Sequence, residues 1–172
     1  MRYPTSLSNS LETTPTVVVS ACLLGAQCRY DGQSKGVPAL LPLLQGFAVV
    51  PVCPELLAGM GVPRPAIEWR SHDGKFAVVS EDGVDVTPRL RRSCVQIVES
   101  LRPLQPICAV LKERSPSCGV HQTHLNGEVV AGQGMFTRRL EPHCSHLFSE
   151  EELELVREFL VARRPSSGVG SP

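Results

Sequence analysis

Three short runs of consecutive apolar residues, rich in β-branched side chains, set the expected architecture of this chain. They begin at Thr16 (TVVVSACLLG), Phe47 (FAVVPVCPE) and Ile107 (ICAVLKERSPSCG). Apolar runs of this length, bounded by glycine, proline or polar residues, are typical of strands that are buried on both faces. Each run ends in a loop that contains a cysteine. We therefore expect three buried strands, each followed by a cysteine-bearing loop.

Helical periodicity marks three of the segments outside these strands. One segment begins at Pro88, with Thr87 as its expected N-cap, and its apolar positions are spaced three or four residues apart. A shorter helix is expected from Val37 to Gly46. A third is expected from Ser149, where a serine cap and acidic residues open the segment and arginines close it. The apolar positions of the first segment are Leu90, Cys94, Ile97, Val98 and Leu101.

Strands that alternate with helices predict an α/β fold: one compact domain with a mainly parallel sheet flanked by helices. The segment KFAVVSEDGVDVT adds a small hairpin around Asp82 and Gly83. The domain is expected to span residues 16–164, between flexible segments at 1–15 and 165–172 that are rich in Ser, Thr, Pro or Gly. Parallel sheets bind ligands beyond the carboxyl ends of their strands, which is where the cysteine loops are expected.

Composition narrows the class of protein. Seventeen basic residues balance seventeen acidic ones, so the chain as a whole lacks the charge that draws proteins to nucleic acid. No apolar stretch suits a membrane span, and the N-terminus has no secretory core, so we expect a cytoplasmic protein. Seven cysteines form an odd number in a chain of 172 residues, which favours thiol or metal chemistry over a disulfide framework.

The cysteines that follow the expected strands suggest a metal or cluster site. Cys22 and Cys28 share one loop, Cys53 follows the second strand and Cys118 follows the third. Three or four thiolates from several strand ends suit zinc or an iron–sulfur cluster. The chain lacks the close CxxC pairs that are usual in structural zinc sites, which favours the cluster.

A carboxylate and a hydroxyl stand beside these thiols in the sequence. Glu55 follows Cys53 by two residues, and Ser115 precedes Cys118 by three. Three protein ligands around a four-iron cluster would leave one iron open as a Lewis acid, and a carboxylate nearby can position or deprotonate water. A serine hydroxyl can donate to a substrate or hold that water. Glu55 and Ser115 are therefore candidate catalytic residues.

Basic and aromatic residues in the same loops are candidates for substrate binding. Lys112 and Arg114 lie close to Cys118 in the sequence. We expect their charge to depress the pKa of the thiols and to hold an anionic group. Arg29 and Tyr30 suit a clamp on a phosphate or a stack on a heterocycle. The alternative for Arg29 is an ion pair at the start of a helix.

Other residues are assigned to structure or left open. The segment VPRPAIEWR is expected to be rigid and extended over the site, with Arg64 and Glu68 either paired to each other or facing the ligand. Cys94 lies on the apolar stripe of a helix and Cys108 within a strand, so we expect both to pack in the core. Cys144 is expected to be a loop thiol.

Several motifs, in the same order, resemble the thiouracil desulfidases. They are SACLLGAQCRYDG, CPELLAGMGVPRPAIE, DGVDVT, LKERSPSCG and SEEEL, and they extend from about Val17 to about Leu160. The resemblance implies a compact α/β fold that holds a [4Fe-4S] cluster through three cysteines. It also implies an iron without a protein ligand, which takes the sulfur of a thiolated pyrimidine such as thiouracil or 4-thiouridine. Water then replaces that sulfur, and hydrosulfide leaves without any change of oxidation state.

The resemblance also implies the role of each residue. The cluster ligands would be Cys22, Cys28 and Cys118, and the catalytic pair would be Glu55 and Ser115. Cys53 also matches the family motif and stands as an alternative ligand. The partner would be a small thiolated base or nucleotide, with tRNA less favoured because the chain is neutral and carries no additional domain.

Two other functions fit the same residues. One is a non-catalytic iron–sulfur or zinc module for sensing or sulfur transfer. The other is an enzyme that uses only thiol chemistry, with Cys118 as the nucleophile and His121 or His124 as the base. Both histidines follow the Cys118 loop, so substrate contact and plain surface exposure are both open for them.

Overall fold

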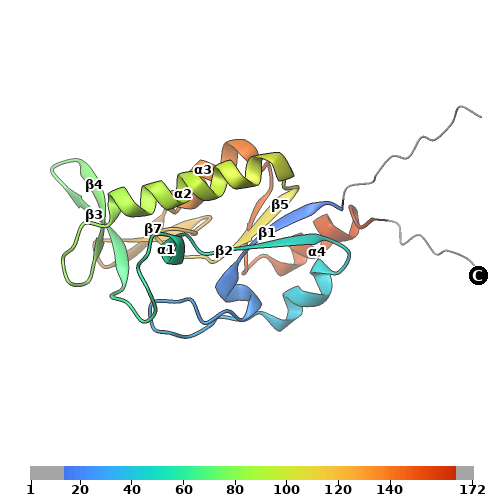
Figure 1. The fold of residues 1–172 in the computed structure, drawn as a ribbon, viewed down its shortest axis with the longest axis horizontal. Coiled ribbons are helices and arrows are strands. Elements are labelled where there is room, and N and C mark those ends of the chain that lie inside the picture. Colours follow the sequence, from blue (N-terminus) through green and yellow to red (C-terminus); the bar gives the residue numbers. More distant parts are fainter. Residues whose placement is uncertain (1–13, 166–172) are drawn as a thin grey trace, which may run out of the picture.

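A parallel sheet of four strands, called sheet A here, forms the centre of the fold in the order β2-β1-β5-β8 (Figure 1). The computed structural model describes residues 14–165, so the flexible segments expected at 1–15 and 165–172 lie almost entirely outside the described residues. The three apolar runs form β1, β2 and β5, as expected. The strands of sheet A are β1 (Thr16–Ser20), β2 (Ala48–Val52), β5 (Cys108–Leu111) and β8 (Leu147–Ser149).

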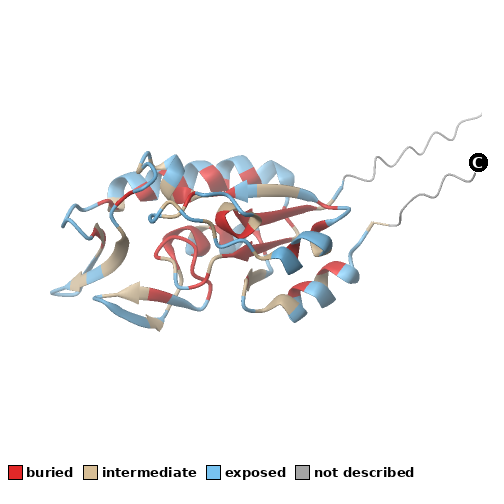
Figure 2. Cartoon of the chain, turned by 90° about the horizontal axis from the view of Figure 1, so that it is seen from below, coloured by how far each residue is buried: buried red, intermediate tan, exposed pale blue. Residues whose placement is uncertain are grey.

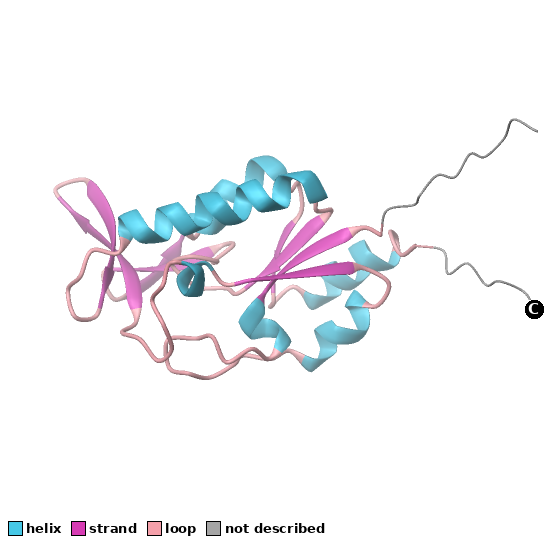
Figure 3. Cartoon of the chain, in the orientation of Figure 1, coloured by secondary structure: helices cyan, strands magenta, loops and turns pink. Residues whose placement is uncertain are grey.

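Helices and 3₁₀ segments cover both faces of sheet A, as Figure 3 shows. Val17 and Val19 share one core cluster with Leu160 near the C-terminus, whereas Val18 belongs to a second cluster on the opposite face with Leu90. Buried positions concentrate in the central strands and on the helix faces turned toward them (Figure 2). Each fully buried valine of β1 stabilises the fold by roughly 1.5–3 kcal/mol. The predicted α/β class is confirmed.

The helical elements are shorter than their sequence segments. The segment after Val37 forms a 3₁₀ helix because Pro42 has no N–H with which to continue an α-helical ladder. Among the described residues, no helix is long and apolar enough to cross a membrane. The α-helices are α1 (Pro54–Leu57), α2 (Thr87–Leu101), α3 (Met135–Leu140) and α4 (Leu153–Val161), and the 3₁₀ helices are η1 (Ala21–Leu24), η2 (Pro38–Leu44), η3 (Arg102–Leu104) and η4 (Glu141–His143).

Both expected helix caps are wrong in detail. Thr87 lies inside α2, and its hydroxyl accepts a hydrogen bond from Val78 N at 2.7 Å, while the Asp85 carboxylate receives the Thr87 N–H at 2.8 Å. Ser149 ends β8 instead of capping α4. Its N–H donates to the carboxylate of Glu152 at 2.7 Å, which closes a turn ahead of the helix.

A second sheet, sheet B, takes the place of the small hairpin that the sequence predicted. Its order is β4-β3-β6-β7, and it consists of two antiparallel hairpins joined by the parallel pairing of β3 with β6. The turn between β3 and β4 lies at Asp73 and Gly74, both with positive φ. The tight turn expected at Asp82 and Gly83 exists, but only one isolated bridge follows it. The strands are β3 (Ile67–His72), β4 (Lys75–Ser80), β6 (Gln122–Leu125) and β7 (Glu128–Ala131).

The order of sheet A creates a crevice at its carboxyl edge. After β1 the chain moves to β2 on one side, whereas after β5 it moves to β8 on the other side. Neighbouring strands whose connections diverge in this way leave a gap beyond their carboxyl ends, where α/β proteins bind ligands. The loops after β1 and β5 carry Cys22 and Cys118, so the topology brings the predicted cysteine loops to this crevice.

Candidate active site

A cavity of about 730 Å³ opens at the carboxyl edge of sheet A. The loops after β1, β2 and β5 form one wall, and Ile67, Glu68 and His124 of sheet B contribute to the other. The candidates that the sequence places in these three cysteine-bearing loops all line the cavity. These residues are Cys22, Cys28, Arg29, Tyr30, Cys53, Glu55, Lys112, Arg114, Ser115 and Cys118.

Four free thiols line the cavity, and burial raises the pKa of each of them. The pKa of Cys22 is raised to about 11 by burial, although Lys112 acts in the opposite direction. Burial also raises the pKa of Cys53 to about 11, and it raises the pKa values of Cys28 and Cys118. Lys112 lowers the pKa of Cys22, as expected of a basic neighbour, but the loss of hydration on burial outweighs this charge.

The thiols do not converge on a single point. Among residues 14–165, no three His, Cys, Asp or Glu side chains are grouped so as to hold one metal ion. Cys53 differs from the other three in being only partly buried, and its Sγ lies 3.8 Å from the carbonyl oxygen of Cys28, to which it donates. The sulfurs thus line a shared cavity without forming a closed single-ion site.

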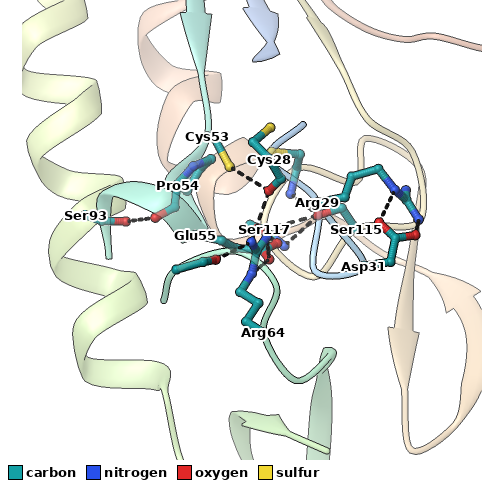
Figure 4. A network of polar contacts seen from close by, with 12 residues as sticks. Cys28, Arg29, Asp31, Cys53, Pro54, Glu55, Arg64, Ser93, Ser115 and Ser117 are labelled. Carbon is teal, nitrogen blue, oxygen red and sulfur yellow. Dashed lines mark hydrogen bonds and ion pairs between the residues drawn. The ribbon is translucent and has the colours of Figure 1, made fainter. Parts of the chain in front are cut away.

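Glu55 is held from two sides (Figure 4). The Arg64 guanidinium donates to Oε2 from Nε at 3.0 Å and from Nη2 at 2.6 Å, and the Ser117 hydroxyl donates to Oε1 at 2.5 Å. The first turn of α1, which carries Glu55, is fixed by the Ser93 hydroxyl of α2, which donates to the Pro54 carbonyl at 2.6 Å. Both carboxylate oxygens are therefore engaged and oriented.

The Ser115 hydroxyl serves its own loop. Its Oγ accepts the N–H of Ser117 at 3.2 Å and of Cys118 at 3.1 Å, and it lies 3.2 Å from the Ser117 hydroxyl. A serine that accepts backbone N–H groups two and three residues ahead stabilises a tight turn. Ser115 thus reaches Glu55 only through Ser117, a residue to which the sequence analysis gave no role.

The loop from Ser115 to Cys118 is held by two further elements. The buried carboxylate of Glu113 accepts the N–H of Gln122 at 2.7 Å and that of His121 at 3.1 Å. At the start of α3, Gly134 N donates to Gly119 O at 2.8 Å, and the next two N–H groups donate to carbonyls of the loop. These bonds fix the position of the Cys118 thiol relative to β5.

The three basic residues that the sequence suggests for substrate binding are paired with carboxylates. Arg29 Nη2 lies 3.0 Å from Asp31 Oδ2, and its guanidinium carbon is 5.3 Å from the centre of the Tyr30 ring. Lys112 Nζ lies 2.5 Å from Glu150 Oε1, and Arg114 pairs with Glu151. The ion-pair alternative for Arg29 is the one observed. The proposed contacts of these residues with substrate stay a prediction.

Of the alternatives left open for Arg64 and Glu68, mutual pairing is not observed, although both residues line the cavity. Arg64 does not pair with Glu68, because Glu68 Oε1 pairs with Arg70 Nη2 at 2.6 Å while Arg64 turns toward Glu55. His121 pairs with Glu152 through Nε2 at 2.8 Å, so only His124 of the two candidate histidines lines the cavity.

The remaining cysteines lie away from the cavity. Cys94 and Cys108 are fully buried in the core, as expected. Cys144 lies at the end of η4 and is also buried, with its Sγ 3.7 Å from the His146 carbonyl oxygen. The expectation of a loop thiol is correct for its position, although its side chain packs in the core.

The fold and the cavity together define a class of protein: an α/β domain whose crevice beyond the parallel sheet is lined by thiols, a carboxylate and serine hydroxyls. Within that class, the chain belongs to the 2-thiouracil desulfurase family, whose model matches residues 17–152. This establishes the family that the motifs resembled.

Two individual proteins support the assignment. The chain is 36% identical to the solved structure of the [4Fe-4S]-dependent thiouracil desulfidase TudS, with a TM-score of 0.75, and the match covers 86% of this chain and 99% of that one. The chain is also 29% identical over 146 residues to the uncharacterized protein YbbK of Bacillus subtilis (strain 168), covering 80% of this chain and 97% of that protein.

Proposed function

We propose that this chain is a [4Fe-4S]-dependent desulfidase that hydrolyses the carbon–sulfur bond of a thiolated pyrimidine, of the thiouracil or 4-thiouridine type. The functional unit would be residues 16–164, acting in the cytoplasm. The observation that carries the proposal is the shared cavity, where three buried thiols from two strand-end loops lie beside an oriented carboxylate. The likeness to TudS adds the cofactor and the reaction type.

The residues of the cavity fit the cluster in their chemistry. Cys22, Cys28 and Cys118 would be its ligands, since thiolates are the usual ligands of iron–sulfur clusters. When bound through three thiolates, such a cluster supplies an iron with an open position, which acts as a Lewis acid toward sulfur. Cys53 would stay a thiol, because it already donates to the Cys28 carbonyl.

The proposed reaction replaces the thiocarbonyl sulfur with oxygen from one water molecule. Glu55 accepts a proton from the attacking water through Oε1, which receives one hydrogen bond from Ser117, whereas Oε2 receives two from Arg64. The serine pair then provides a path for that proton, because Ser117 links Glu55 to Ser115 by contacts of 2.5 and 3.2 Å. The departing hydrosulfide carries the remaining proton, so the reaction needs no oxidant or reductant.

A small uncharged base or its nucleotide is the proposed substrate. Arg29, Tyr30, Lys112 and Arg114 line the cavity, and the ion pairs of the three basic residues would have to open, or be shared, to bind a phosphate. Turnover of a thiouracil, its nucleoside monophosphate and a thiolated tRNA, compared at equal concentration, separates these substrates.

Anaerobic purification tests the proposal directly. The protein should carry about four irons per chain and broad visible absorption, as expected for a cluster of this type. It should also release uracil and hydrosulfide from thiouracil. Glu55→Gln should keep the iron and lose most of its turnover, with a measurable residual rate, whereas in a non-catalytic module the same substitution would affect neither the iron nor the sensing or sulfur-transfer function. A colourless protein without iron would contradict the proposal.

The ligand set is tested by matched cysteine variants. Cys28→Ala and Cys118→Ala should lose most of the iron, whereas Cys53→Ala should retain it. The opposite result, with iron lost in Cys53→Ala and kept in Cys28→Ala, would make Cys53 the ligand instead.

A further inference from the structure

We propose that Arg64 is a positioning residue that couples the orientation of Glu55 to the loop bearing Cys28. One guanidinium would then set both the geometry of the carboxylate and the stability of the cluster. This inference rests on the proposed function and deepens it by giving a role to a residue that lies outside the ligand set and the catalytic pair.

The contacts of Arg64 join two loops that belong to different strands. Its side chain is only 4% exposed. Nε and Nη2 donate to Glu55 Oε2, in α1 directly after β2, while Nη1 donates to the carbonyl of Cys28 at 3.0 Å, in the loop after β1. Nη1 also donates to Gly61 O at 2.9 Å. Because the guanidinium is planar and its donors have fixed directions, Glu55 cannot shift without disturbing the Cys28 carbonyl.

The backbone of Arg64 strengthens the same link. Its N–H donates to the carbonyl of Tyr30 at 2.9 Å, so one residue holds the Cys28 loop at two carbonyls that are two positions apart. Figure 4 shows the guanidinium lying between Glu55 and Cys28, with Cys53 on the other side of the Cys28 carbonyl. Movement of the Cys28 thiol on binding a cluster would therefore reach Glu55 through Arg64.

A lysine cannot reproduce this arrangement. Its three donors share one nitrogen, whereas Arg64 spreads its bonds over three nitrogens that face a carboxylate and two carbonyls. Arg64→Lys therefore keeps the charge and loses the geometry, and Arg64→Met loses both. Arg70→Met is the matched control for the cluster, because Arg70 lines the same cavity but is half-exposed and pairs only with Glu68.

The first experiment measures cluster loss and turnover in the holoenzyme. With an iron chelator and no oxygen, decay of visible absorbance should be about tenfold faster in Arg64→Met, as is typical when a residue that orients a ligand is lost. Glu55→Gln and Arg70→Met should decay at the wild-type rate. Arg64→Met should also lower kcat about tenfold with little change in KM. In the double variant, Arg64→Met should cause no further loss of kcat beyond that caused by Glu55→Gln alone.

The second experiment uses the protein without iron, so that it stands apart from the proposed function. Amide hydrogen exchange in residues 26–33 should be faster in Arg64→Met and Arg64→Lys than in wild type, and unchanged in Arg70→Met. A wild-type protein that never binds iron would sink the proposed function but leave this test intact. Equal exchange and equal cluster decay in wild type and Arg64→Lys would overturn the coupling, as would independent effects of Arg64→Met and Glu55→Gln on kcat.

Discussion

Gly134 packs against the backbone of the loop that carries Cys118. The substitution Gly134→Ala, which adds one methyl group there, tests how tightly the two segments are packed. A Cβ at Gly134 would lie 2.6 Å from Cys118 N and closer still to the carbonyl carbon and oxygen of Ser117. These are backbone atoms of a loop whose carbonyls accept hydrogen bonds from the N–H groups of Gly134, Met135 and Phe136, so they cannot rotate away. Gly134→Ala must therefore move either α3 or the Cys118 loop.

Overpacking of this kind costs about 1–3 kcal/mol, which for a domain of this size lowers Tm by roughly 2–12 °C. Gly36→Ala is the control, because its Cβ would lie 3.5 Å from Gly25 Cα, an ordinary contact, at a backbone conformation open to alanine. Urea unfolding of the iron-free proteins should show a lower midpoint for Gly134→Ala at an unchanged slope. Equal midpoints for Gly134→Ala and Gly36→Ala would refute the close packing of this loop.

Three further predictions concern the scaffold. Asp85→Ala removes the bond to Thr87 N at the start of α2 and should cost about 0.5–2 kcal/mol in chemical unfolding. Cys108→Ala should cost about 1 kcal/mol, because it leaves a small cavity, and should retain all of its iron. Burial would raise the pKa of Glu152, but the hydrogen bonds from the Ser149 N–H and from His121 outweigh burial and lower that pKa. The ionised carboxylate therefore stabilises the fold at any pH above the ordinary pKa of a glutamate. Stability should fall as pH drops through the lowered pKa, and less steeply in His121→Ala.

The sequence predicts well which edge of sheet A carries the cysteines, because each strand can be recognised from its own local run of apolar residues. Each apolar run identifies a strand, and parallel strands end at one edge, so Cys22, Cys53 and Cys118 are brought together without knowledge of any contact. This prediction does not require the order of the strands. The strand order has to be known only to predict the crevice between the loops after β1 and β5.

Sheet B and the carboxylate clamp are poorly predicted, for different reasons. Strands β3, β6 and β7 of sheet B are largely exposed or half-exposed, so neither apolar runs nor a clear alternation marks them, whereas β4 coincides with one arm of the expected hairpin. The clamp depends on side-chain direction, which spacing does not give. Ser115 and Ser117 both precede Cys118 closely, yet only Ser117 reaches Glu55, because Ser115 bonds to its own loop. Likewise, the sequence suggests Glu68 as a partner for Arg64, whereas in the structure Arg64 pairs with Glu55.

The separation of the thiols along the chain has a consequence for how the protein matures. More than half of the sequence lies between Cys22 and Cys118, and the two meet only because β1 and β5 pair side by side. Pairings between such distant segments form slowly, since the intervening chain must first be closed into a loop. A nascent or unfolded chain therefore presents scattered thiols. In the proposed enzyme, cofactor insertion follows folding, and a chain that fails to pair β1 with β5 has nowhere to receive a cluster.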